Sequence, residues 1–66
     1  MKEIKIMIDL IEKMIAIRIR LGLSQERLAQ RLGVTTITIN RWESGKFHPT
    51  GLYKEKVENF VKRMDK

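Results

Sequence analysis

The chain has 66 residues and a net charge of +6, which leaves room for one domain, spanning residues 1–66, with one small core. It has no cysteine and one histidine, His48, which excludes disulfides, thiolate metal sites and a histidine cluster, so we expect no metal and no cofactor. Charged residues interrupt the apolar stretches well short of the roughly 20 residues that a membrane span needs. We therefore expect neither a membrane span nor a secretory signal.

The first half of the chain predicts two helices separated by a short break. The first runs over about residues 2–21 and ends at Gly22, which can adopt the left-handed conformation common after helix C-termini. Ser24 has the chemistry of an N-cap, so a second, short helix is expected over residues 25–32. Gly33 ends that helix for the same reason that Gly22 ends the first.

The second half predicts two more helices. Thr35 is the N-cap of a third helix that reaches residue 43 or 44, where Gly45 stops it. A last helix is expected over about residues 50–63. The predicted fold class is all-α, a compact bundle of four helices, with a helix-turn-helix over about residues 24–44.

The first helix carries more apolar surface than packing on one side requires, because its apolar residues cover more than half of its circumference. We expect the surplus to contact a second copy of the chain or a partner protein. The residues expected on this surface are Ile4, Met7, Ile8, Ile11 and Ile15. Two alternatives remain open: the last helix covers the surplus, or Ile4, Ile6 and Ile8 alternate along a strand.

The distribution of charge is uneven along the chain, and this bears on the class of partner that the domain could bind. Acidic and basic residues balance over residues 1–17, whereas residues 18–48 contain six Lys and Arg against two Glu. A basic region suits a polyanion such as nucleic acid, although a merely solvated surface would have the same composition.

The third helix carries the residues that we expect to recognise DNA. Ile39 and Trp42 lie three positions apart and point inward, which turns the opposite arc outward. Arginine pairs with guanine, asparagine pairs with adenine, and apolar groups contact the thymine methyl, in a groove about 12 Å wide that admits a helix. The residues predicted to read base edges of double-stranded DNA are Thr36, Ile37, Asn40 and Arg41.

These motifs together resemble the lambda-repressor-like, Cro and Xre group of helix-turn-helix regulators. The resemblance rests on the pattern SQxxLAxxLGV over Ser24–Val34, a third helix that ends in WESGK, and the proline that follows. It covers about residues 17–49. It implies a bundle of four or five helices and a dimeric transcriptional regulator from a prokaryote or phage, located in the cytoplasm at the nucleoid.

The resemblance also implies roles for single residues. It implies that Gln25 binds a DNA phosphate and braces the third helix, and that Thr35 and Lys46 hold the DNA backbone. It implies an ion pair between Arg18 and Glu43 that joins the first helix to the end of the third. Members of the group usually continue into a fifth helix that helps them dimerise, so here the first helix is the expected dimer contact.

We thus predict a sequence-specific DNA-binding regulator, with repression as the expected mode. No catalytic residue is predicted, because the sequence has no cysteine nucleophile, no Gly-rich phosphate loop and no convincing carboxylate pair. Two alternatives remain: an antitoxin-type regulator that also binds a partner protein, and a protein-interaction module of the same fold that does not read bases.

Overall fold

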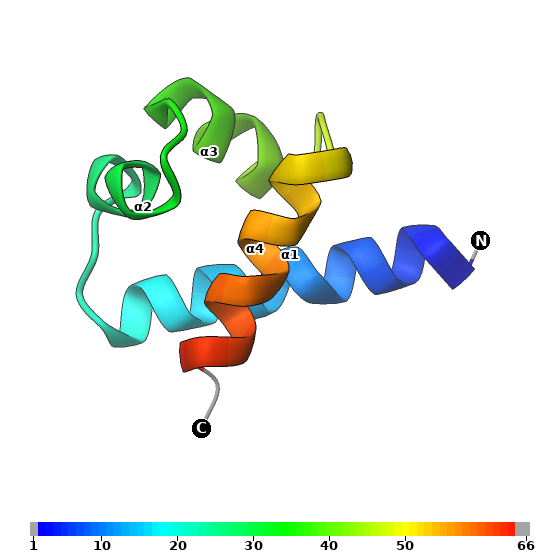
Figure 1. Cartoon of the computed structure of the whole chain (residues 1–66), viewed down its shortest axis with the longest axis horizontal. Coiled ribbons are helices and arrows are strands. Elements are labelled where there is room, and N and C mark those ends of the chain that lie inside the picture. The colour runs from blue at the N-terminus through cyan, green and yellow to red at the C-terminus, as the bar shows by residue number, and fades with distance from the viewer. Residues whose placement is uncertain (1, 65–66) are drawn as a thin grey trace.

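The computed structural model describes residues 2–64, with side chains from Lys5 onward. The four helices are α1 (Lys2–Arg20), α2 (Gln25–Leu32), α3 (Thr36–Glu43) and α4 (Gly51–Met64). Figure 1 shows α4 crossing α1, with α2 and α3 together on one side of α1. The predicted all-α bundle of four helices is confirmed over the described residues. Within the same range, no helix has the length and apolar character needed to cross a bilayer.

The ends of α2 and α3 are set by the capping residues expected from the sequence. Ser24 Oγ accepts a hydrogen bond from the Arg27 backbone N–H at 3.1 Å, which satisfies a free donor at the start of α2. Gly33 has a φ of 71°, the left-handed conformation that glycine adopts without strain, and it ends α2. Thr35 Oγ1 accepts from the Thr38 backbone N–H at 3.2 Å and starts α3. The turn between the two helices is therefore short and locally determined.

The core lies where the four helices meet, and each helix contributes one side chain with no exposed surface. These side chains are Met14, Leu28, Ile39 and Val57, each 0% exposed. Trp42 on α3 is 4% exposed, and its ring contacts Tyr53 of α4 edge-on at 6.1 Å between centroids. Because α3 is anchored through Ile39 and Trp42, its opposite side is turned to solvent.

The N-terminal half of α1 differs from the sequence predictions in two ways. It is helical from Lys2 onward, so the strand alternative is wrong. Ile11 is only 6% exposed because it packs into the chain's own core, which removes it from the expected docking surface. Met7 and Ile15 are half-buried and Ile8 is 44% exposed, so α4 does not cover the whole apolar arc. The side chain of Ile4 lies outside the described residues.

Candidate nucleic-acid interface

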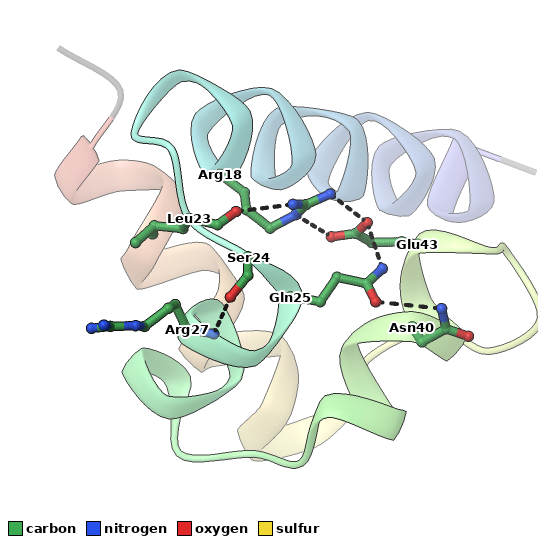
Figure 2. A network of polar contacts seen from close by, with 7 residues as sticks. All are labelled: Arg18, Leu23, Ser24, Gln25, Arg27, Asn40 and Glu43. Carbon is green, nitrogen blue, oxygen red and sulfur yellow. Dashed lines mark hydrogen bonds and ion pairs between the residues drawn. The ribbon is translucent and has the colours of Figure 1, made fainter.

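An ion pair joins α1 to the end of α3 (Figure 2). Arg18 Nε donates to Glu43 Oε2 at 2.8 Å, and Arg18 Nη2 donates to Glu43 Oε1 at 3.0 Å. Arg18 Nη1 donates to the Leu23 carbonyl at 3.0 Å. The two side chains are 18% and 10% exposed, so this two-pronged pair is largely shielded from water. Arg18 thus binds both the Glu43 carboxylate at the end of α3 and the backbone that leads into α2.

Gln25 extends this network to the outer side of α3. Its Nε2 donates to Glu43 Oε1 at 3.0 Å, and its Oε1 accepts from Asn40 Nδ2 at 3.4 Å (Figure 2). A carboxylate only accepts hydrogen bonds, which fixes the direction of the Gln25 amide and hence that of Asn40. The start of α2 is therefore braced against α3. One N–H of the Gln25 amide still has no hydrogen-bond partner among the side chains and backbone described over residues 5–64.

The exposed side of α3 carries the four residues expected to read bases. Thr36, Ile37, Asn40 and Arg41 are all exposed, and Ile37 has 66% of its surface in solvent. Asn40 uses one N–H for Gln25 and keeps its carbonyl oxygen and its second N–H. An adenine edge requires one acceptor and one donor from an asparagine, so the observed bond leaves Asn40 competent to pair with it.

Arg41 is held by an aromatic ring rather than by an acid. Its Cζ lies 5.1 Å from the centroid of the Phe47 ring, and Phe47 is 54% exposed. Among the described residues, no group accepts a hydrogen bond from the Arg41 guanidinium. Sequence reasoning missed Phe47. The sequence shows only that an aromatic residue follows Lys46 in a loop, and this does not predict where its ring lies.

Thr35 and Lys46 flank this exposed side at the two ends of α3. Thr35 caps the N-terminus of the helix, and its Oγ1 also lies 2.8 Å from Thr38 Oγ1. Lys46 is exposed in the loop that follows Gly45. Glu43 is the only acidic residue of α3, and Arg18 neutralises it. The surface formed by α3 and its loop is therefore positive, as binding to a polyanion requires.

A helix-turn-helix family model, that of the Xre- and lambda-repressor-like regulators, matches residues 14–60. The chain belongs to this family. No curated protein and no solved structure matches it significantly. The matched range contains α2, α3 and the loop that carries Phe47, whereas the first turns of α1 lie outside it. Membership supports a DNA-binding regulator, in a family that is typically not enzymatic.

In this helix-turn-helix domain, α2 and α3 differ in how their polar side chains are bonded. Gln25 at the start of α2 takes part in the bracing network, whereas the outer side of α3 keeps most of its polar groups free. An α-helix with side chains is about 10–12 Å across, which matches the major groove. The outer side of α3 is therefore of a size to enter a major groove with most of its polar groups free.

Proposed function

We propose that the chain is a sequence-specific transcriptional regulator, with repression as its mode, that inserts α3 into the major groove of double-stranded DNA. In this proposal Thr36, Ile37, Asn40 and Arg41 face base edges. The supporting observation is the orientation of two neighbours: Trp42 is 4% exposed in the core, and Arg41 points outward with its hydrogen-bond donors free. A protein-interaction module would have no need for a free planar donor set at this position.

Gln25, Thr35 and Lys46 are the proposed contacts to DNA phosphates. Gln25 lies at the N-terminus of α2 and Thr35 at that of α3, where backbone N–H groups attract anions. Lys46 follows the C-terminal end of α3 and adds a full positive charge. Such contacts supply most of the affinity and make it salt-dependent, and they carry little sequence information.

Selection of bound sites from random duplex DNA, followed by binding of variants to the selected site, tests base reading. Arg41→Ala should weaken binding to the selected site by about 1–3 kcal/mol and leave binding to a scrambled duplex almost unchanged. The matched control is Arg63→Ala, because Arg63 is an exposed arginine near the end of α4, away from α3 (Figure 1). An equal loss on both duplexes for Arg41→Ala would contradict its assigned role.

A second copy of the chain is the proposed partner for the apolar residues that remain exposed in the N-terminal half of α1. Ile8 is 44% exposed there, and half-buried Ile15 lies about two turns further along the same face of the helix, whereas half-buried Met7 points toward the face of buried Met14. A hollow of about 160 Å³ between α1 and the end of α3 adjoins Ile8 and Ile15. The charged residues over 5–13 cancel, so two copies would not repel each other there, despite the net charge of +6. A symmetric pair would bind half-sites about 10 base pairs apart, or a multiple of that spacing.

Sedimentation at tens of micromolar tests the dimer. The wild type should sediment as a dimer and Ile8→Lys as a monomer. Leu21→Lys should remain dimeric, because Leu21, which is 42% exposed, directly follows the C-terminal end of α1, whereas Ile8 lies in its N-terminal half. A monomeric wild type that still binds its site would contradict the dimer. It would favour the antitoxin-type alternative, in which the same surface takes a partner protein.

A further inference from the structure

We infer that Phe47 is a positioning residue for base recognition: its ring holds the Arg41 guanidinium in place while leaving the N–H groups of that guanidinium free to meet a guanine. The inference rests on the proposed function, because it assumes that α3 enters the major groove. It adds a residue that lies outside α3 to the determinants of specificity.

The loop after α3 folds back onto the last turn of the helix. The backbone N–H groups of Lys46 and Phe47 both donate to the Arg41 carbonyl, at 3.2 and 3.4 Å. Gly45, with a φ of 80°, allows the chain to reverse direction there. The backbone of Phe47 is thus hydrogen-bonded to Arg41, and the Phe47 ring contacts the side chain of that same arginine. The 5.1 Å separation between Arg41 Cζ and the ring centroid is thus a consequence of the loop path.

An aromatic ring restrains an arginine without using its hydrogen-bond donors. The guanidinium is attracted to the negative face of the ring, while its five N–H donors lie in its own plane. Arg18 illustrates the contrast within the same domain. The Nε, Nη1 and Nη2 of Arg18 all donate to protein oxygens, so these nitrogens serve to hold the fold together. Among the described side chains, Arg41 is contacted by the Phe47 ring and makes no hydrogen bond through its guanidinium, so it keeps its donors.

This restraint should favour binding because a free arginine loses rotamer freedom when it pairs with a base. A side chain that is already oriented loses less of that freedom on binding. Phe47 is 54% exposed and does not belong to the buried core, so we expect its replacement to leave the buried contacts of α3 in place. The effect of a substitution on stability should therefore be small, and its effect on recognition can be measured on the folded domain.

The test first identifies the base pair at which Arg41→Ala no longer discriminates between bases. It then measures discrimination at that base pair in variants of Phe47. Phe47→Leu keeps an apolar side chain but lacks the aromatic face, and should reduce discrimination at that base pair about threefold, which is near the lower end of the cost of immobilising a side chain on binding. Discrimination at other positions should not change. Phe47→Tyr keeps the ring and should behave as the wild type. In the Arg41→Ala background, Phe47→Leu should have no further effect on discrimination.

An independent readout comes from NMR of the free protein. The ring current of Phe47 should shift the Arg41 Hδ resonances upfield in the wild type and in Phe47→Tyr, and this shift should be lost in Phe47→Leu. Unchanged resonances in Phe47→Leu would overturn the inference before any DNA is added.

Two binding outcomes would also overturn the inference, and they differ in what they imply for the proposed function. If Arg41→Ala loses discrimination and Phe47→Leu does not, the positioning role alone is wrong. If Arg41→Ala loses discrimination at no base pair, both the base-reading role of Arg41 and the positioning role of Phe47 are wrong. A uniform loss by Phe47→Leu at every base pair and on scrambled DNA would assign Phe47 to a direct DNA contact instead.

Discussion

Replacing Glu43 with alanine should destabilise the domain strongly, although local helix energetics favour the replacement. Glu43 is the last residue of α3, where a negative charge interacts unfavourably with the helix dipole. Alanine is also the best helix former. Both local effects predict a small gain in stability, so any large loss has to come from Arg18 and Gln25, whose donors would lose their acceptor.

The size of the loss follows from how well Arg18 is shielded. In Glu43→Ala, Arg18 would keep only the hydrogen bond from its Nη1 to the Leu23 carbonyl. Only 18% of the Arg18 side chain is exposed to water. Removing one partner of a fully buried pair costs about 3–5 kcal/mol. The partial exposure of Arg18 and the local helix gain reduce this to about 2–3 kcal/mol. A domain of this length has about 3–10 kcal/mol of stability in total.

Thermal unfolding followed by circular dichroism measures this loss. At about 4–8 °C per kcal/mol for a domain of this size, Tm should fall by about 8–24 °C in Glu43→Ala. The control, Glu58→Ala, removes an exposed carboxylate from α4 and should stay within about 0.5 kcal/mol of the wild type. Arg18→Met should cost less in the Glu43→Ala background than alone. A Glu43→Ala variant that unfolds at the same temperature as the control would refute the reasoning.

Substitutions at three further positions test the core and the caps by chemical unfolding. Leu28→Ala removes a side chain with no exposed surface and should cost about 2–5 kcal/mol, whereas an unchanged midpoint would contradict its burial. Thr35→Ala should cost about 1 kcal/mol through loss of the α3 cap, and Thr35→Ser should retain most of that stability. Gly33→Ala should cost about 1–2 kcal/mol, because its φ of 71° is strained for alanine. A new Cβ there would meet only Lys56 Nζ at 3.4 Å, so a clash would not explain the loss.

The limits of α2 and the start of α3 could be predicted because the signals are local. Ser24 and Thr35 each accept a hydrogen bond from a backbone group three residues later, and Gly33 needs only its own φ to end a helix. The orientation of α3 followed from spacing: Ile39 and Trp42 are three residues apart and both buried, which leaves Arg41 outside.

The remaining features depend on how distant segments approach each other. A helical wheel of α1 shows a wide apolar arc, but only the way the other helices pack against α1 decides that Ile11 is buried and that Ile8 is 44% exposed. The contact of Arg41 with the Phe47 ring depends on the path of the loop after α3, where backbone N–H groups donate to the Arg41 carbonyl. Neither feature can be read from the periodicity of a single segment.

An NMR titration of the labelled domain with its selected duplex tests the central claim most directly. If the outer side of α3 enters the major groove, the largest changes should occur at Thr36, Ile37, Asn40 and Arg41 and in the loop of Lys46 and Phe47. Resonances from the second half of α4 should change little. Changes confined to α1 or α4, with the resonances of α3 unaffected, would contradict the proposed mode of DNA binding.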